Sequence, residues 1–196
     1  SNPEFLAEGT AINDLLNPDR VLIGGEDQES SRTLSKIYEN WIPKEKILLT
    51  NLWSSELAKL VANAFLAQRI SSINSIAALC EATGADVREV SRAIGSDKRI
   101  GSRFLDSGPG FGGSCFPKDS QSLVHLAETR GYGFSMMRSV IAVNDEQRER
   151  MVRKVQRAAG TNDLNGMTIS VLGLTFKAGT EDLRDSPSLA IIGRLR

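Results

Sequence analysis

One glycine-rich stretch holds the residues whose types and spacing best suit covalent chemistry. Residues 108–119 contain four glycines and two prolines, so they cannot form a long regular element, but their backbone can approach a ligand closely. They include a thiol, Cys115, an ammonium, Lys118, and a carboxylate, Asp119. Lys118 and the N-terminus of a helix predicted to begin near Asp119 would both favour the thiolate. We therefore interpret Cys115 as a nucleophile.

A nucleophilic thiolate needs supporting groups elsewhere in the chain. It can add to a carbonyl carbon, and oxidation of the adduct gives a thioester that water must cleave. Cleavage needs a base, for which Glu4 is available, and donors for the oxyanion, for which Lys59 and Asn63 would serve. The alternatives are a redox-sensing thiol at Cys115 and, for Lys59 and Asn63, the ordinary wet face of a helix.

The composition narrows the classes of function. The 24 basic and 24 acidic residues cancel, so a general role in binding nucleic acid or acidic membranes has no electrostatic support. No apolar run is long enough to cross a bilayer. Cys80 and Cys115 do not suggest a disulfide scaffold, so we expect a reducing, cytoplasmic setting. His125 is the only histidine and has no partner at metal-ligand spacing, so we expect no metal site.

The first part of the chain is predicted to form a piece of a parallel sheet. Residues 1–20 are expected to be a loop with a short turn. Residues 20–25 and 46–50 are predicted as strands, and residues 30–41 as the helix between them. Strand, helix and strand in about thirty residues form the smallest parallel crossover. No Gly-x-Gly-x-x-Gly follows either strand, so the dinucleotide-binding fingerprint is absent from this stretch.

A long helix is predicted next, and we expect it to carry a domain or subunit interface. Residues 53–83 contain neither glycine nor proline, and about thirty residues at about 1.5 Å each make a helix of roughly 45 Å. Its apolar residues recur at helical spacing, and they are Leu57, Leu60, Val61, Ala64, Phe65, Ile73, Ile76, Ala77 and Cys80. Cys80 is therefore expected to be a packed core thiol.

After the long helix the sequence predicts further helices, and then a return to strand-like spacing near the end of the chain. The elements predicted there are helices over 86–95, 119–129 and 135–159, with Ser135 as a cap, a linker over 160–163, a strand over 167–173, and a helix opened by Ser186 and Pro187. The returning strand is interpreted as the start of a second α/β domain. Because there is no initiating Met and the last residues stop inside a predicted helix, we expect a piece of a longer protein.

Three blocks of sequence carry a family resemblance. They are residues 2–11, NPEFLAEGTA, residues 110–119, GFGGSCFPKD, and residues 172–177 with 180–184, LGLTFK and TEDLR. With them the chain resembles the UDP-glucose/GDP-mannose dehydrogenase family, and most closely its UDP-glucose 6-dehydrogenases, over essentially its whole length. The cysteine block is specific to nucleotide-sugar dehydrogenases.

The resemblance implies a mostly α chain with a central helical dimerisation domain built on a long core helix. This domain would span residues 53–160. It would be flanked by the end of one Rossmann-like α/β domain, the NAD-binding domain, over 1–52, and by the start of a second, truncated UDP-binding domain over 165–196. The implied partners are a nucleotide-sugar substrate and at least one further copy of the chain, with no nucleic acid and no membrane.

The implied activity is oxidation of UDP-glucose at C6 to UDP-glucuronate, with NAD as cofactor and two NAD+ used per turnover. The aldehyde would be held on Cys115 as a thiohemiacetal, oxidised to a thioester and hydrolysed. The alternatives are a GDP-mannose or other nucleotide-sugar 6-dehydrogenase and, for these residues alone, a non-catalytic dimerisation module. We expect residues 1–196 by themselves to have little or no activity.

The resemblance also assigns roles to matching positions. The catalytic residues would be Cys115 as nucleophile, Glu4 as base through water, Lys59 and Asn63 as oxyanion donors, and Asp119 in proton transfer. The residues near NAD would be Glu8, Lys118 and Arg184. The substrate-binding residues would be Phe5, Leu6, Glu8, Lys59, Asn63, Arg99, Phe104, Gly110, Phe111, Gly112, Phe176 and Lys177, with Arg99 reaching the substrate of a neighbouring subunit.

One position departs from the family pattern. Asp106 stands where animal members carry a lysine that faces the substrate. A carboxylate there would disfavour contact with a phosphate. Asp106 is therefore given no substrate role.

Overall fold

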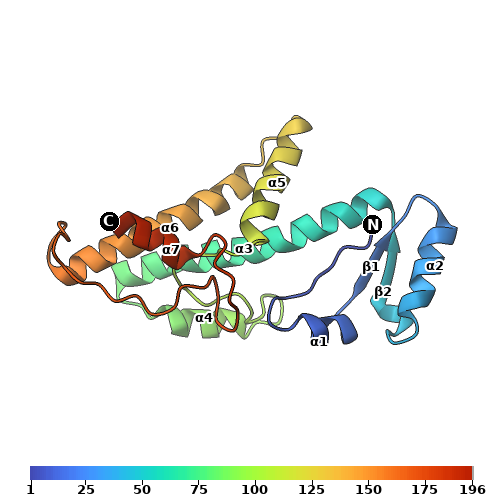
Figure 1. Ribbon diagram of the computed structural model, residues 1–196, viewed down its shortest axis with the longest axis horizontal. Helices are drawn as coiled ribbons and strands as arrows, with labels where there is room; N and C mark the ends of the chain where they lie inside the picture. Colours follow the sequence, from blue (N-terminus) through green and yellow to red (C-terminus); the bar gives the residue numbers. More distant parts are fainter. Residues whose placement is uncertain (196) are drawn as a thin grey trace. The chain divides into compact units, whose positions relative to one another are not determined.

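The computed structural model describes residues 1–195. The chain divides into two compact units, one over Ser1–Ala62 and one that begins at Asn63. The chain is mostly α-helical with two strands among the described residues, which confirms the predicted fold class (Figure 1). The elements in order are α1 (Ala11–Leu16), β1 (Val21–Gly24), α2 (Gln28–Tyr38), the 3-10 helix η1 (Lys44–Lys46), β2 (Ile47–Thr50), α3 (Leu52–Thr83), α4 (Val87–Gly95), α5 (Phe116–Thr129), α6 (Ser135–Ala159) and α7 (Pro187–Leu195).

The first unit contains the predicted parallel crossover. Strands β1 and β2 pair in parallel, with Val21 opposite Ile47 and Gly24 opposite Thr50, and α2 connects them. The side chains of Val21, Ile23 and Ile42 form a small buried cluster, against which apolar residues of α2 pack. The turn before α2 is stabilised by Asp27, whose carboxylate accepts a hydrogen bond from the Ser30 N–H at 2.7 Å.

Residues 1–20 differ from the predicted loop, because they include the short helix α1. Six residues are too few for an apolar period to be recognised in the sequence. A local network stabilises the helix instead. The Asp14 carboxylate accepts hydrogen bonds from the Ala7 N–H at 2.9 Å and from the Thr10 hydroxyl at 2.8 Å.

Helix α3 confirms the predicted long helix, and its last turn has a well-defined end. Gly84 follows it with a positive φ of 78°, and the Ala85 N–H donates to the Cys80 carbonyl at 3.0 Å. This is the glycine-terminated cap in which a backbone bond reaches back over the last turn. The buried apolar residues of α3 in the second unit are Ala64, Ala67, Ile73, Ala77 and Cys80.

The predicted apolar face of α3 is only partly buried. Leu57 of the first unit is exposed, and in the second unit Phe65, Ile76 and Leu79 are exposed, with Phe65 at 64%. Helical geometry places Phe65, Ile76 and Leu79 within one stripe of α3. The apolar residues that the sequence pattern assigned to one face of α3 thus lie on two faces. One face is buried inside the second unit, and the other is exposed.

Helix α6 packs beside the second half of α3. Helix α6 is joined to α3 by the Ser71 hydroxyl, which donates to the Val140 carbonyl at 2.8 Å, and by ion pairs of Glu81 with Arg150 and Lys154. Helices α5 and α6 form a hairpin, and α7 lies against α6 (Figure 1). Residues far apart in the sequence are thereby brought to one side of α3.

Three local predictions are corrected. Helix α5 begins at Phe116, three residues earlier than predicted, because Pro117 is well suited to the first helical turn. Ser135 is the first residue of α6, and its side chain does not cap the helix. Residues 167–173 do not form the predicted strand, because β-structure needs a hydrogen-bonded neighbour and the structure pairs no strand with this segment among residues 1–195.

The predicted start of the last helix is confirmed. The Ser186 hydroxyl oxygen accepts from the Leu189 N–H at 3.4 Å, and the hydroxyl donates to the Leu174 carbonyl at 2.6 Å. Pro187 is the first residue of α7. Ser186 thus caps α7 and also ties it to the segment that precedes it.

Candidate active site

Cys115 lies where the glycine-rich loop meets helix α5. It is the residue before the first turn of α5, and its side chain is exposed. The Asp119 N–H donates to the Cys115 carbonyl at 2.8 Å, so the backbone of the cysteine is already part of the helix. The N–H groups of a first helical turn favour negative charge beside them. The sulfur is therefore accessible to a reagent and close to the positive end of α5.

A buried carboxylate lies in the first turn of α5. The Asn63 Nδ2 donates to Asp119 Oδ2 at 2.6 Å, and both side chains are buried. The exposed Lys118 has its Nζ 3.6 Å from Asp119 Oδ1. Within the second unit, the structure thus brings Asn63 of α3 to Lys118 and Asp119, which lie in the first turn of α5 after Cys115.

The segment before α7 packs against the glycine-rich loop. The Gly113 N–H donates to the Arg184 carbonyl at 2.9 Å. A Cβ at Gly113, whose φ is +82°, would lie 2.8 Å from the Phe176 ring, and a Cβ at Gly112 would lie 2.2 Å from the Asp185 carbonyl oxygen. Only glycine allows this approach.

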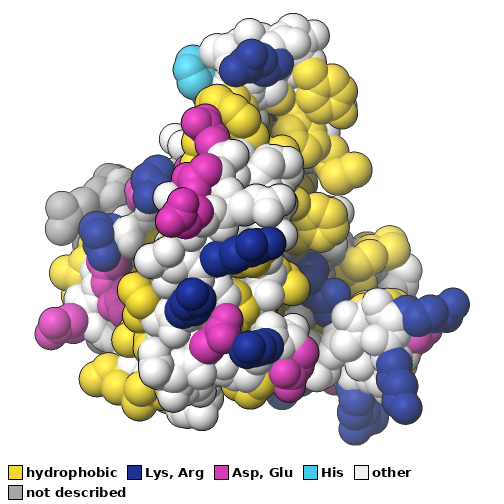
Figure 2. Space-filling view, turned by 90° about the vertical axis from the view of Figure 1, so that its right-hand side faces the viewer, with side chains coloured by type: hydrophobic (Ala, Val, Ile, Leu, Met, Phe, Trp, Pro, Cys, Tyr) yellow, Lys and Arg dark blue, Asp and Glu magenta, His cyan; other side chains and the backbone are white. Residues whose placement is uncertain are grey.

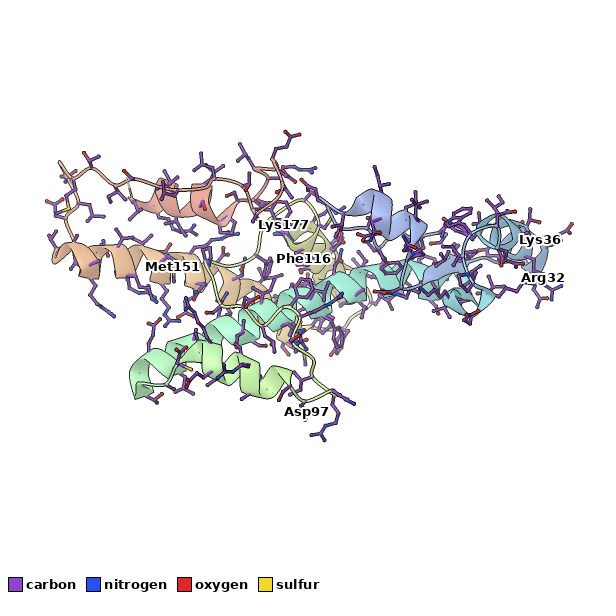
Figure 3. The ribbon with its side chains drawn as sticks, turned by 90° about the horizontal axis from the view of Figure 1, so that it is seen from below. Arg32, Lys36, Asp97, Phe116, Met151 and Lys177 are labelled. Atoms are coloured by element: carbon purple, nitrogen blue, oxygen red, sulfur yellow. The ribbon has the colours of Figure 1, made fainter. Side chains whose placement is uncertain are left out.

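Aromatic rings surround the same loop. Phe116 lies 6.2 Å from Phe111 and 6.2 Å from Phe104, measured between ring centroids. The Nζ of the exposed Lys177 lies 5.6 Å from the ring centroid of Phe176. Phe116 and Lys177, labelled in Figure 3, mark the two segments that meet at the loop. Of the predicted substrate residues, Phe111, Gly112 and Phe176 are thus gathered around Phe116 and Gly113.

Phe104 has an unusual backbone conformation. Its φ is +62°, in the left-handed region that a bulky side chain rarely adopts. The residues just before it are held by Arg69 of α3, whose guanidinium donates to the carbonyls of Ile100, Gly101 and Arg103 at 2.7–3.0 Å. Sequence reasoning missed this contribution. A cation inside a mostly apolar helix stretch is the pattern that could have indicated it.

Arg99 lies on the exposed connector after α4. Its guanidinium donates three hydrogen bonds to the carboxylate of Asp97, the shortest at 2.6 Å (Asp97 is labelled in Figure 3). Hydrogen bonds from the Arg99 side chain and backbone lower the pKa of Asp97. The same pairing raises the pKa of Arg99, which therefore stays a cation.

The first unit holds two of the predicted catalytic residues as an ion pair. The Lys59 Nζ lies 3.2 Å from Glu4 Oε1, and the Leu6 N–H donates to Glu4 Oε2 at 2.7 Å. The Phe5 ring lies between two cations, with the Arg20 guanidinium 3.9 Å and the Lys59 ammonium 5.4 Å from its centroid. Leu6 and Glu8 are exposed.

The segment that carries Glu4 is fixed to the edge of the sheet. The Gly24 N–H donates to the Ser1 carbonyl at 2.8 Å, and the Asn2 side chain donates to the Leu22 carbonyl at 2.8 Å. The Tyr38 hydroxyl donates to Asn2 Oδ1 at 2.6 Å. Glu4 is therefore two residues from a backbone that β1 and α2 hold in place.

The turn between β1 and α2 does not fit the pyrophosphate of a dinucleotide. A pyrophosphate binds to the free N–H groups of a helix N-terminus after a glycine-rich turn. Here the carboxylate of Asp27 occupies that position, and a hydrogen bond from the Ser30 N–H lowers its pKa, so it carries a negative charge. The described residues of the first unit thus hold no phosphate cradle at this turn.

The described residues offer neither a metal site nor a membrane span. Across residues 1–195, no group of three or more His, Cys, Asp or Glu side chains is placed to hold a metal ion. His125, cyan in Figure 2, lies at the surface. Within the same residues, none of the helices combines the length and the apolar character that a bilayer span requires.

Two domains of one protein family match this chain. Residues 53–146 match the central domain of the UDP-glucose/GDP-mannose dehydrogenase family, and residues 1–42 match the NAD binding domain of the same family. UDP-glucose 6-dehydrogenase of Gallus gallus is 58% identical over 97% of this chain and 40% of its own length. UDP-glucose 6-dehydrogenase 1 of Arabidopsis thaliana is 51% identical over 100% of this chain and 42% of its own length.

Solved structures share the fold. A UDP-glucose dehydrogenase from the hyperthermophilic archaeon Pyrobaculum islandicum superposes with a TM-score of 0.95 at 36% identity, over 100% of this chain and 44% of its own. A UDP-D-ManNAc dehydrogenase from Pyrococcus horikoshii has a TM-score of 0.86 at 27% identity, over 100% of this chain and 46% of its own. The chain thus spans less than half the length of the relatives and structures that it matches.

Proposed function

This chain belongs to the UDP-glucose/GDP-mannose dehydrogenase family, and from that premise we propose that the protein oxidises the C6 alcohol of UDP-glucose to the carboxylate of UDP-glucuronate with NAD. The observation that carries the proposal is the exposed Cys115 at the N-terminus of α5, inside a glycine loop that other side chains hold. NAD binding is the function of the family domain that matches residues 1–42. Bound NAD+ supplies the acceptor for the hydride, and the steps below concern residues of this chain.

The covalent step uses the thiol of Cys115. Its sulfur forms a bond to the C6 aldehyde carbon, the C=O double bond becomes a single bond, and the thiol proton goes to the oxygen. Loss of the C6 hydride from this thiohemiacetal, together with the hydroxyl proton, gives a thioester. Water then forms a bond to the thioester carbon, the C–S bond breaks, and the carboxylate leaves while Cys115 regains a proton.

Asn63 and Asp119 support this step by their contact. The Asp119 carboxylate, 2.6 Å from Asn63 Nδ2, fixes the amide so that its second N–H can donate elsewhere. We assign that second N–H to the oxyanion that develops at C6, as the family resemblance implies. Asp119 exchanges the proton near the thiol, and Lys118, 3.6 Å from Asp119, keeps a positive charge beside it.

Glu4 and Lys59 are assigned to the oxyanion and the hydrolysis. The 3.2 Å pair between them orients the ammonium of Lys59, whose side chain is only 18% exposed. In the proposed mechanism Lys59 stabilises the oxyanion, and Glu4 accepts a proton from the water that cleaves the thioester. The Phe5 ring, which faces Lys59, limits the positions that the ammonium can take.

We propose UDP-glucose and not GDP-mannose as the substrate because of the names of the similar proteins. Those quoted at 51–58% identity are named UDP-glucose 6-dehydrogenases. Phe111, Gly112, Phe176 and Lys177 are the residues that we assign to the sugar-nucleotide pocket. NADH formation by the full-length enzyme, compared between the two sugars, checks this choice, and faster turnover of GDP-mannose would reverse it.

A homo-oligomer formed through α3 is part of the proposal. The exposed stripe of Phe65, Ile76 and Leu79 supports it, since apolar residues along one helix stripe are usually covered. Arg99 is assigned to the substrate of the neighbouring subunit. Phe65→Glu should shift the full-length enzyme to a smaller species in sedimentation, and an unchanged species would exclude α3 as the interface.

The decisive experiment looks for the covalent intermediate. The full-length enzyme is mixed with UDP-glucose and NAD+, quenched in acid, and examined by intact and peptide mass spectrometry. We expect a sugar-nucleotide adduct on the peptide that contains Cys115. Adducts on another residue, or turnover without an adduct in an enzyme whose Cys115 has been replaced by serine, would refute the covalent mechanism.

A reducing compartment suits this chemistry. Cys115 and Cys80 are both free thiols in the structure, and the proposed catalytic thiol works only while it stays reduced. We therefore keep the cytoplasm as the proposed location.

A further inference from the structure

The loop that carries Cys115 is fastened to α6 at Phe111, mainly by the buried side chain of Asn144. Arg148 of α6 adds a longer bond, from Nη2 to the Phe111 carbonyl at 3.3 Å. The Phe111 N–H donates to Asn144 Oδ1 at 2.7 Å, and Asn144 Nδ2 donates to the Phe111 carbonyl at 3.0 Å. Asn144 is only 5% exposed. One amide thus satisfies both backbone groups of Phe111, as a neighbouring strand would, and it does so where water has little access.

The same amide is pressed against the preceding residue of the loop. Gly110 has a φ of +112°, and a Cβ there would lie 2.6 Å from Asn144 Oδ1. Gln147, one turn further along α6, donates from Nε2 to the Gly108 carbonyl at 2.7 Å, and Gly108 donates its N–H to Asn74 Oδ1 of α3 at 2.8 Å. The side-chain amides of Asn74, Asn144 and Gln147 thus hold the loop. Asn144 binds Phe111, which is the held residue nearest to Cys115 in sequence.

The distance from this anchor to the sulfur is short. Three residues lie between Phe111 and Cys115 in the sequence, and the N–H of the middle one, Gly113, is fixed by the Arg184 carbonyl at 2.9 Å. After Cys115 the backbone is helical. The packing of Gly112 and Gly113 restricts the backbone between Phe111 and Cys115. A shift of Phe111 would therefore move Cys115 as well.

We propose that Asn144 is a positioning residue for Cys115: it sets the place of the sulfur through Phe111 and does not contact the substrate. An amide is required, since a carboxylate has no N–H for the Phe111 carbonyl and an alkyl group has neither donor nor acceptor. This inference rests on the proposed function for its effect on turnover. Its effect on the loop can be measured without turnover.

The experiment compares three variants of the full-length enzyme. Asn144→Ala removes the two bonds that Asn144 makes to Phe111 and leaves the bond from Arg148 Nη2 to the Phe111 carbonyl at 3.3 Å. Gln147→Ala removes one bond at Gly108, further from the cysteine. Val152→Ala is the matched control, because Val152 is a buried residue of α6, about two turns beyond Asn144, whose truncation leaves a cavity. The readouts are kcat, the rate of adduct formation on Cys115 in a single turnover, and hydrogen exchange of the amides in residues 108–113.

We expect Asn144→Ala to lower kcat and the adduct rate about a hundredfold, the loss that a misplacement of about 1 Å can cause. Gln147→Ala should lower both less, and Val152→Ala should leave both within about twofold although it lowers stability. Exchange in residues 108–113 should become faster in Asn144→Ala and stay unchanged in Val152→Ala.

Two results would overturn the proposal. One is an adduct rate of Asn144→Ala no lower than that of Val152→Ala, and the other is unchanged exchange in residues 108–113. If the unaltered enzyme forms no adduct at all, the proposed function fails. The exchange data and the rate at which iodoacetamide alkylates Cys115 then decide the positioning role alone, with unchanged values in Asn144→Ala rejecting it. If Asn144→Ala does not fold, Asn144→Asp, which keeps the acceptor for the Phe111 N–H, replaces it in the same comparison.

Discussion

The two cysteines of the second unit occupy opposite kinds of place. Cys80 is 5% exposed in the last turns of α3, and its carbonyl closes the cap at the C-terminal end of the helix. Cys115 is exposed and precedes the first turn of α5, at the N-terminal end. The same kind of side chain is thus buried in one region and open to reagents in the other.

The difference shows that surroundings decide the role of a thiol. At Cys80 the helix is long, the cap is complete and the side chain fills space. At Cys115 the preceding chain is glycine-rich, the helix begins there, and a buried Asn63–Asp119 pair lies one turn on. The predictions below test this contrast between the Cys115 region and the Cys80 region.

The largest effect is expected from exchanging each sulfur for oxygen. Cys115→Ser in the full-length enzyme should lower conversion to the acid at least about a thousandfold, as removal of a nucleophile does. Cys80→Ser should keep kcat within about threefold, because that site touches no substrate. Product formation followed by chromatography measures both, and a large loss of turnover in Cys80→Ser alone would reverse the contrast.

The next largest effect is expected at two glycines that share a left-handed backbone conformation. Gly113 and Gly84 have φ values of +82° and +78°, but only at Gly113 would a Cβ meet a neighbour, the Phe176 ring at 2.8 Å. Both alanine variants incur the left-handed strain of about 1–2 kcal/mol. Gly113→Ala should lose further stability and most activity, which thermal unfolding and turnover assays will show. Equal losses in the two variants would mean that Phe176 moves aside freely.

A smaller effect is expected on stability at Cys80. Cys80→Ser places a hydroxyl in a buried apolar site and should lower the free energy of unfolding by about 1–3 kcal/mol. Cys115→Ser, at an exposed position, should change it by less than about 0.5 kcal/mol. Urea unfolding followed by circular dichroism separates the two. A stable Cys80→Ser variant would show that the site tolerates polarity.

The smallest effect is a pH dependence beside Cys80. Hydrogen bonds from Lys154 and then Arg150 lower the pKa of Glu81 from its ordinary value of 4.5. A depressed carboxyl pKa stabilises the fold above the unfolded value and loses this contribution as the pH falls through the folded value. The pair is partly exposed, so solvent keeps the effect small.

Glu81→Gln should therefore flatten the fall of the melting temperature below pH 4.5, relative to the unaltered protein. Asp145→Asn, which removes an exposed carboxylate of α6 that pairs with Arg148, serves as the control and should leave the slope in place. Identical slopes for all three proteins would show that Glu81 contributes nothing measurable to acid stability.

Much of the fold followed from patterns in the sequence. The parallel crossover, α3 and α6 were predicted within a few residues, because strand length and helical spacing extend over enough residues to be recognised. Helix α1 was missed since it is short and is held by Asp14. The strand over 167–173 was predicted from its apolar run, yet a strand exists only with a paired neighbour, which a local pattern cannot supply.

The reactive residues of the proposed site could be named from the sequence, but the residues that hold its loops in place could not. Cys115, Lys118 and Asp119 stand together in the sequence, so their meeting was expected. Asn144 and Arg69 were missed, because a single asparagine or arginine within a helix looks like any surface residue. Their roles depend on contacts with backbone groups more than thirty residues away, and only the folded chain reveals these.

The close packing of Gly112 and Gly113 has a consequence for how sequences of this kind can diverge. Since a Cβ at either position would overlap Phe176 or the backbone at Asp185, the two segments cannot change independently. Among homologues, a side chain at position 113 should appear only together with a smaller residue at position 176. The glycine loop and the segment before α7 are thus expected to evolve as one unit.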